Sequence, residues 1–501
     1  MSDRENKRLG AVPKKYEFLS QDPSVKVMPI VISLIIGAFF AMLNETLLNI
    51  ALKTLMAEFD ISITTVQWMA TGFMLVMGMV IPVSAVMMQW FTTRQMFLGT
   101  LIIFTIGTII CAAAPNFSLL LAGRFMQAVG TGLLTPVIFN IFLLLYPPEK
   151  RGAMLGLVGL VFMFAPAIGP TLSGVIVEYL GWRYLFIIVI PFMIFSILFA
   201  FKYLVNISEI TKPKVDIASI ILSMAGFGTL VYGFSSAGEA KGGFTNPVVL
   251  GSIIIGIILL TIFSIRQLKL KEPLLDLKVF KYPMFRLGAI VFVLVMMAML
   301  SSEIILPLFM QGPLGLAAAT AGLVLLPGSI LNGLMSPVMG KLFDKFGPRV
   351  LMVPASILLA LTLLMFSFLS ANTPSWQIVA GYILLMISVS AMFMPSETNA
   401  LNQLPKSMYT HGTAVLSTLQ PVAGAIGVSV FVGLMSARQN YLLEQSGSPE
   451  SPLAQVDSFV GGVRFVYIIG FALAVLTFFL ALRMRRSQPA VEEEKAVDKA
   501  S

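Results

Sequence analysis

The sequence predicts an all-α protein that crosses a membrane fourteen times, and three observations carry this prediction. First, 57% of the 501 residues are hydrophobic and 11% are charged, with a mean hydropathy of +0.91, whereas soluble domains carry roughly 25% charged residues. Second, fourteen separate runs are apolar enough to span a bilayer, which takes about 20 residues. Third, if the chain starts in the cytoplasm and crosses the membrane at each run, 27 of the 33 lysines and arginines fall in the segments on the cytoplasmic side.

The fourteen runs divide the chain into six, two and six predicted spans. In order they are 28–52, 65–88, 96–114, 118–145, 152–178, 183–204, then 216–235 and 247–265, then 286–311, 319–340, 349–370, 376–403, 410–437 and 462–483. An even number of spans keeps the basic N- and C-terminal segments on one side, so we expect both termini in the cytoplasm. The predicted domains are a tail 1–27, a six-helix bundle 28–204, two extra spans with a loop 205–285, a second six-helix bundle 286–484 and a tail 485–501.

Composition argues against several function classes. One cysteine, Cys111, and one histidine, His411, leave no disulfide and make a metal site improbable on chemical grounds. No phosphate-binding lysine loop points to ATP. A membrane-embedded enzyme would need a nucleophile with a base or a metal cluster, and no such group of residues stands out. We therefore expect no enzyme activity, no cofactor and no nucleic-acid partner.

The fifth predicted span is rich in residues that helices normally avoid. It reads GLVGLVFMFAPAIGPTLSG over 156–174, with Gly169, Pro170 and Gly174 near its end. Small residues four apart let two membrane helices approach closely, and proline can bend a helix. An ordinary packing face would explain this stretch as well.

Two segments resemble signatures of the major facilitator transporters. Gly169-Pro-Thr-Leu-Ser-Gly174 resembles their antiporter motif in helix five, and Gly340-Lys-Leu-Phe-Asp-Lys-Phe-Gly-Pro-Arg349 resembles their short cytoplasmic loop. With fourteen spans, the chain resembles the drug:proton antiporters of this superfamily, the lincomycin-resistance type in particular. The resemblance implies two six-helix bundles related by a pseudo-twofold axis and alternating access between two sides.

The short loop and its counterpart are candidate conformational motifs. Gly347 and the following proline favour a tight turn, and Asp344 could accept hydrogen bonds at a nearby helix start. The residues assigned to this role are Gly340, Asp344, Gly347 and Arg349, with Gly169, Pro170 and Gly174 in span five. The matching loop in the first half keeps Arg94 but has no aspartate. A plain turn that follows the positive-inside rule is the alternative.

Charged residues within spans are the candidate functional groups, because such charges are costly in a bilayer. Arg124 lies in Gly-Arg-Phe-Met-Gln127, which looks like the helix-four motif of the family. Glu45 lies in a segment that resembles the subfamily's helix-one motif, where Asn44 replaces the common aspartate. Glu303 and Glu397 complete the set. The alternative for each glutamate is a purely structural role as a paired buried acid. The alternative for Arg124 is a side chain that reaches the membrane–water interface.

Glu45 and Glu303 are predicted to be equivalent carboxylates on the first helix of each half, facing one cavity. We expect Glu45 to be the charge partner of Arg124, Glu303 to be the main proton carrier, and Glu397 to lie on the inward exit. Candidate substrate-cavity residues are polar and lie within or at the ends of spans: Asn44, Asn49, Gln127, Asn140 and Gln311.

The function that these features predict is proton-coupled export of amphipathic or cationic compounds through the bacterial cell membrane. Protons, small-molecule substrates and the lipid bilayer are the expected partners, and a monomer is the expected state. An exporter of one physiological solute, such as a lipid, siderophore or amino acid, would use the same fold and stays an alternative.

Overall fold

The computed structural model is helical throughout the part of the chain that it describes, which is residues 26–145, 165, 168–206, 216–237, 243–270, 273, 275–405, 408–447 and 450–487. The α-helices of the N-terminal half are α2 (Val27–Phe59), α3 (Ile63–Val66), α4 (Trp68–Trp90), α5 (Thr93–Ala113), α6 (Phe117–Leu145), α8 (Tyr184–Ile187) and α9 (Val189–Tyr203), with a further helical stretch over 168–179. The central pair is α10 (Ile217–Ser236) and α11 (Pro247–Lys269). The C-terminal half contains α12 (Pro283–Gln311), α13 (Ala318–Phe346), α14 (Pro348–Phe366), α15 (Ser375–Asn402), α16 (Tyr409–Gln445) and α17 (Pro452–Arg483).

Thirteen helical segments of the described chain are long and apolar enough to cross a membrane. They correspond to all the predicted spans except the fifth, 152–178, most of which lies outside the described residues. The two predicted tails, 1–27 and 485–501, also lie almost entirely outside them. The all-helical membrane architecture expected from hydropathy is confirmed.

Local sequence explains where several of these helices begin and end. The Thr92 hydroxyl accepts a hydrogen bond from the Gln95 backbone N–H, and the Gln95 side-chain oxygen accepts one from the Thr92 backbone N–H, so a reciprocal capping box starts α5. Between α13 and α14, Gly347 has φ +79°, a left-handed conformation that favours glycine, and Pro348 then begins α14. The tight turn predicted for this loop is therefore present.

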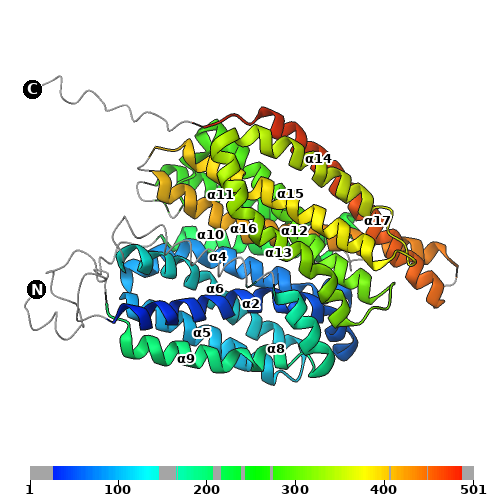
Figure 1. The fold of residues 1–501 in the computed structure, drawn as a ribbon, viewed down its shortest axis with the longest axis horizontal. Helices are drawn as coiled ribbons and strands as arrows, with labels where there is room; N and C mark the ends of the chain where they lie inside the picture. Colours follow the sequence, from blue (N-terminus) through cyan, green and yellow to red (C-terminus); the bar gives the residue numbers. More distant parts are fainter. Residues whose placement is uncertain are drawn as a thin grey trace, which may run out of the picture.

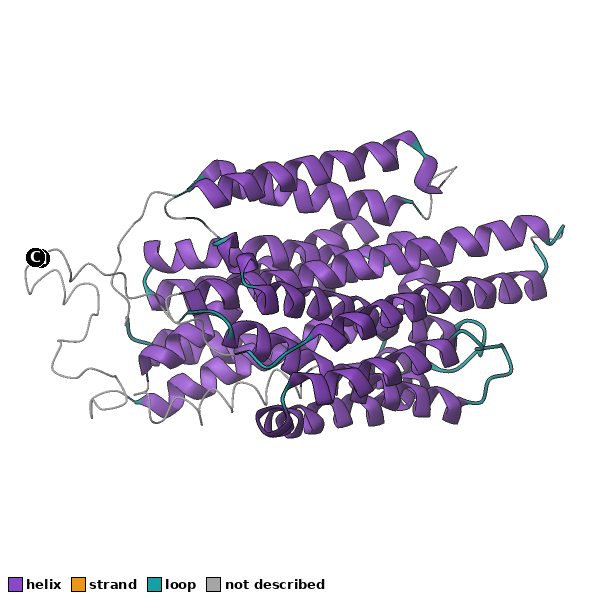
Figure 2. Ribbon diagram, turned by 90° about the horizontal axis from the view of Figure 1, so that it is seen from above, coloured by secondary structure: helices purple, strands orange, loops and turns teal. Residues whose placement is uncertain are grey.

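The helices pack as two groups with a pair at the seam between them. In the first group α2 packs on α9, and α6 packs on both α4 and α5; in the second, α13 and α14 pack on α15, and α12 and α17 pack on α16. Figure 1 shows the first group, in blue to green, below and the second, in green to red, above. Figure 2, from above, shows the helices running lengthwise side by side.

The central helix α10 touches both groups. It packs on α4 of the first and on α16 of the second, while α11 covers its other side. Phe227 and Val231 of α10 join a small apolar cluster with Met74 and Met79 of α4 and Ala425 of α16. The extra pair therefore lies against the seam of the two halves.

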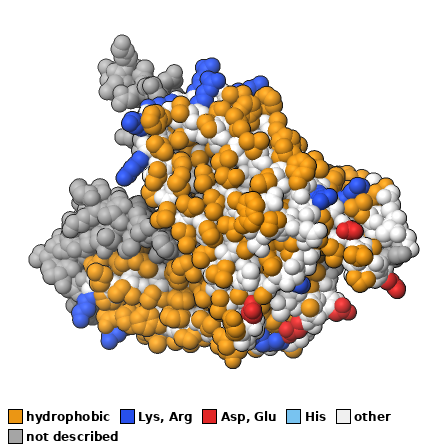
Figure 3. All heavy atoms as spheres, turned by 45° about the vertical axis from the view of Figure 1, so that its right-hand side comes forward, with side chains coloured by type: hydrophobic (Ala, Val, Ile, Leu, Met, Phe, Trp, Pro, Cys, Tyr) orange, Lys and Arg blue, Asp and Glu red, His pale blue; other side chains and the backbone are white. Residues whose placement is uncertain are grey.

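The lateral surface of the molecule is apolar. On α11 four isoleucines at 254, 255, 257 and 258 are each about half exposed, and Figure 3 shows hydrophobic side chains covering the middle of the molecule with charged ones toward its ends. Apolar patches of this extent are uncommon on soluble monomers. The surface suits contact with lipid, so this is a multi-pass membrane protein.

Candidate functional site

Glu45 and Glu303 interrupt two otherwise buried stretches of helix. On α2 residues 41–44 and 46–52 are buried, and on α12 residues 301, 302 and 304–311 are buried, but both glutamates are partly accessible. In a membrane helix a carboxylate normally faces the bundle interior or a water-filled cavity. Both side chains thus point into accessible space within the protein.

The two carboxyl groups lie close enough to interact electrostatically. Their helices, α2 and α12, pack against each other across the two halves. Two ionised carboxylates in such a setting repel each other, and a dry surrounding strengthens this repulsion. The structure therefore brings together the pair that the sequence matched by position.

Arg124 lies at the centre of the N-terminal half with no exposed surface. Its Nη1 donates to the Asn44 side-chain oxygen at 2.8 Å and to Gln127 Oε1 at 3.0 Å, and its Nε donates to the Met69 carbonyl at 3.3 Å. The guanidinium also lies over the Phe73 ring, 4.1 Å from its centroid. Oxygen acceptors and an aromatic face thus hold this cation in place.

The direct partner of Arg124 differs from the expected one. Arg124 and Glu45 are near enough for electrostatic attraction, but the hydrogen bonds go to Asn44, and no ion pair within 4 Å joins Arg124 to Glu45 in the described structure. Successive residues of a helix point about 100° apart. Asn44 therefore faces α6, while Glu45 is left facing the accessible space.

Tyr382 is a neighbour of Glu303 that sequence reasoning missed. It comes from α15, it is almost fully buried, and it lies within electrostatic range of the Glu303 carboxyl. Its hydroxyl is 3.4 Å from the Ser329 hydroxyl of α13. A tyrosine in an apolar span gives no pattern of its own, so only the packing of α12, α13 and α15 identifies it.

Glu397 stands apart from this pair. It lies on α15, partly accessible, one turn before the helix ends at Asn402. Its neighbour Asn399 faces elsewhere and binds the chain after α17, donating to the Arg485 carbonyl at 3.1 Å and accepting from the Ser487 backbone at 3.0 Å. A role for Glu397 on an inward exit stays a prediction.

The candidate cavity residues have varied surroundings. Gln127 is buried, and its amide donates to Thr108 at 2.8 Å while its oxygen accepts from Arg124. Asn44 and Asn49 are also buried, whereas Asn140 is partly accessible. Asn44 and Gln127 are thus engaged in holding Arg124, and Asn140 is the member of this group that offers accessible surface.

The small residues of span five contact two different partners. Gly169 faces α2, where a Cβ would come within 2.1 Å of the Thr46 hydroxyl oxygen. Gly174 faces α13, where a Cβ would lie 2.4 Å from the Ala318 carbonyl, and a Cβ on Gly322 of α13 would lie 2.5 Å from the Pro170 carbonyl. The close packing expected here is therefore present: the contact of Gly169 lies within the N-terminal half, and the contacts with α13 form a seam that joins the two halves.

The predicted cytoplasmic motifs are described in part. The side chain of Asp344 is outside the described atoms, so its expected contact stays a prediction. Gly340 has open space around it, and Arg349 lies exposed in the first turn of α14. In the first half, Arg94 donates to the Phe201 carbonyl near the end of α9 and lies 4.8 Å from the centroid of that ring.

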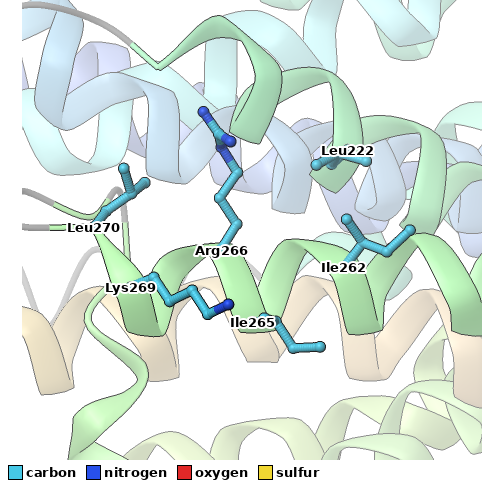
Figure 4. A pocket seen from close by; sticks show the side chains of 6 residues that line it. All are labelled: Leu222, Ile262, Ile265, Arg266, Lys269 and Leu270. Atoms are coloured by element: carbon cyan, nitrogen blue, oxygen red, sulfur yellow. The ribbon is translucent and has the colours of Figure 1, made fainter.

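A shallow hollow of about 370 Å³ lies elsewhere, at one end of the central pair. Figure 4 shows the side chains that line it, which come from both helices of the pair and the residue after them: Leu222, Ile262, Ile265, Arg266, Lys269 and Leu270. Arg266 is already paired with Asp216 through two hydrogen bonds of 2.7 and 2.8 Å. This hollow is open, mostly apolar and on a different element from the carboxylates. Within the described chain no three histidine, cysteine or acidic side chains gather as a metal site would require.

Comparison with known proteins places this arrangement in context. The sequence model of the Major Facilitator Superfamily matches residues 34–428. The lincomycin resistance protein LmrB of Bacillus subtilis (strain 168) is 48% identical over 461 residues, 92% of this chain and 96% of that protein. Its namesake in Listeria monocytogenes is 46% identical over 466 residues, 93% of this chain and 98% of that protein. A crystal structure of a POT family transporter in complex with 5-aminolevulinic acid has a TM-score of 0.65 at 15% identity, covering 93% of this chain and 98% of that one, and shares the fold.

Proposed function

Because the chain belongs to the major facilitator superfamily, we propose that it is a proton-coupled multidrug efflux antiporter that exports amphipathic or cationic compounds by alternating access. Drug efflux is supported by the lincomycin resistance proteins, which match nearly the whole chain. The observation that carries proton coupling is the pair Glu45 and Glu303, which come one from each half, on helices that pack together, and lie close enough to interact electrostatically. The protein lies in the bacterial cell membrane, and we expect both termini in the cytoplasm.

Two neighbouring carboxylates, one from each half, suit exchange of protons for a cation. When both are ionised they repel each other and attract a cationic substrate, and when one takes up a proton both effects weaken. A proton and a cationic compound would then compete for the same place. Such competition, combined with a change in which side the site faces, gives antiport.

The two glutamates are not equivalent in their surroundings. Glu45 has the buried cation Arg124 within electrostatic range, whereas the neighbours of Glu303 include the neutral Tyr382. The positive charge of Arg124 attracts the Glu45 carboxylate, which suits a site that senses substrate charge. We therefore assign proton carriage mainly to Glu303, and substrate sensing or gating to Glu45 with Arg124 and Asn44.

One chain contains both halves of the alternating-access unit, so we propose a monomer as the transporting unit. No chemical conversion of the substrate is part of this proposal. Purified protein should accordingly return an exported compound unchanged.

The test is transport by purified protein in liposomes. Lincomycin and a lipophilic cation are supplied on the side that corresponds to the cytoplasm, and a pH gradient of either sign, or none, is imposed. Proton-coupled export predicts transport that requires the gradient, reverses with its sign and stops when a protonophore is added. Transport that is indifferent to the gradient would contradict the proposal, and transport of one unrelated solute alone would favour the specific exporter.

A further inference from the structure

Lys53 of the N-terminal half reaches the end of a helix in the other half. Its ammonium donates to the main-chain carbonyl of Gln311, which is the last residue of α12. The last carbonyls of a helix have no partner within the helix and carry its negative dipole end. A lysine there supplies both a hydrogen bond and the matching charge.

Glu178 does the opposite at the start of the next helix. Its Oε2 accepts a hydrogen bond of 3.0 Å from the backbone N–H of Ala319, in the first turn of α13, where Ala317 at the N-cap position provides no side-chain hydrogen bond of its own. The first N–H groups of a helix carry its positive dipole end and favour a carboxylate. Glu178 therefore serves as the missing cap from the other half.

These two contacts flank a single turn. Residues 312–317 connect the end of α12 to the start of α13, and Lys53 and Glu178 hold the two sides of that turn with charges of the sign that each helix end prefers. Neighbouring bonds reinforce the contact: the Gln311 amide donates to the Ile50 carbonyl at 2.9 Å, and the Thr171 hydroxyl donates to the Gly322 carbonyl at 3.1 Å.

The position of Lys53 relates the turn to the carboxylate pair. Lys53 and Gln311 are 258 positions apart, which is also the separation between Glu45 and Glu303. At two levels along α2 and α12, therefore, a residue of α2 lies near the residue of α12 that the pseudo-twofold relation makes its equivalent. Eight residues, or about 12 Å of helix, separate the two levels.

We infer that Lys53 and Glu178 form a charge clamp on the turn 312–317, which holds the two halves together at the predicted outer end. Both contacts cross between the halves, so separation of the halves at that end breaks both at once. The clamp favours the state that is closed to the outside. It acts on the conformational equilibrium itself, and it does so without a proton gradient or a bound substrate.

Distance measurements between spin labels test the clamp. Cys111→Ser removes the native cysteine, and labels at Ala113→Cys and Asn372→Cys, exposed sites near that end of the two halves, report their separation in lipid nanodiscs. Lys53→Met and Glu178→Gln should each raise the ratio of long to short distances by about two- to fivefold. Lys53→Arg, which keeps the charge, should match the parent.

Matched controls remove charges whose bonds stay within one half. Arg464→Met breaks a bond to the Leu369 carbonyl inside the C-terminal half, and Glu58→Gln weakens bonds to Trp182 and Arg183 inside the N-terminal half. Both should leave the distances unchanged. The clamp is refuted when Lys53→Met and Glu178→Gln match the parent, or when the controls shift the distances equally. Neither result depends on proton coupling, because no gradient is applied.

Discussion

At the scale of single residues, position 44 decides how the buried cation is held. Arg124 has no exposed surface, and Asn44 supplies one of its shortest hydrogen bonds. A neutral amide leaves the positive charge of Arg124 uncancelled at that point, so its field extends to Glu45. With asparagine at position 44, the acid of this site is Glu45, which keeps accessible surface, and not a residue on the buried face of the helix.

Asn44→Leu should destabilise the folded protein. Leucine has a similar volume but accepts no hydrogen bond, and hydrogen bonds to charged groups contribute about 1.5–3 kcal/mol. Thermal unfolding in detergent should show a loss of that size, while Asn140→Leu, at a partly accessible position, should show much less. Equal stability of Asn44→Leu and the parent would mean that Asn44 does not hold Arg124.

At the scale of elements, the stretch 168–179 and α13 meet through small residues rather than through polar bonds alone. The Gly174 contact leaves no room for a methyl group next to the Ala318 carbonyl. Gly99 of α5, in contrast, has nothing within 4 Å of the position where a Cβ would lie. Alanine substitutions at these two positions therefore distinguish the effect of packing from the effect of helix propensity.

Gly174→Ala should lower both stability and transport. Forcing a methyl group into a filled contact typically costs about 1–3 kcal/mol, whereas Gly99→Ala should be neutral or stabilising by up to about 1 kcal/mol. Unfolding in detergent and initial rates of drug export measure the two effects. If the Gly174→Ala protein is as stable and active as the Gly99→Ala protein, close contact between the stretch 168–179 and α13 is not required.

The end of the central pair carries an ion pair whose pH dependence has a definite sign. Hydrogen bonds from Arg266 are the main cause that lowers the pKa of Asp216 to about 2. An acid with a lowered pKa stabilises the fold above its ordinary value near 4 and loses that contribution as the pH falls toward 2. The stability difference between the parent and Asp216→Asn should therefore be constant from pH 5 to 8.

The size of that difference should be small. Arg266 is substantially exposed, and solvent-exposed ion pairs contribute about 0–1 kcal/mol. Unfolding of the parent and Asp216→Asn at several pH values measures it. A difference that grows between pH 5 and 8 would assign the pH dependence to another group.

At the scale of the whole molecule, the features that could be predicted from the sequence are those that depend on its composition and on patterns repeated in the two halves. Apolar runs identify the spans because the bilayer demands about 20 apolar residues for each, and the glycine–proline pair at 347 and 348 identifies the turn between α13 and α14. The relation between Glu45 and Glu303 follows from their similar distance to a basic residue at the start of each half, since Glu45 lies 19 residues after Lys26 and Glu303 lies 17 residues after Arg286.

Contacts that depend on how the helices pack against one another could not be read from the sequence. Whether Asn44 or Glu45 faces Arg124 depends on the rotation of α2, and the sequence contains no signal for that rotation. Tyr382 lies near Glu303 although its helix, α15, comes much later in the sequence than α12. Lys53 and Glu178 bind backbone atoms, which every residue possesses, so no residue pattern predicts their partners.

Proton-driven export by Glu303→Gln in liposomes is the most direct measurement of the proposed mechanism. Glutamine keeps the shape of the side chain but cannot carry a proton, so the variant should bind substrate measurably yet show no export when a pH gradient is imposed. Glu45→Gln, made and reconstituted in parallel, should impair substrate binding or expression first. Full proton-coupled export by Glu303→Gln would contradict the assignment of proton carriage to this carboxyl.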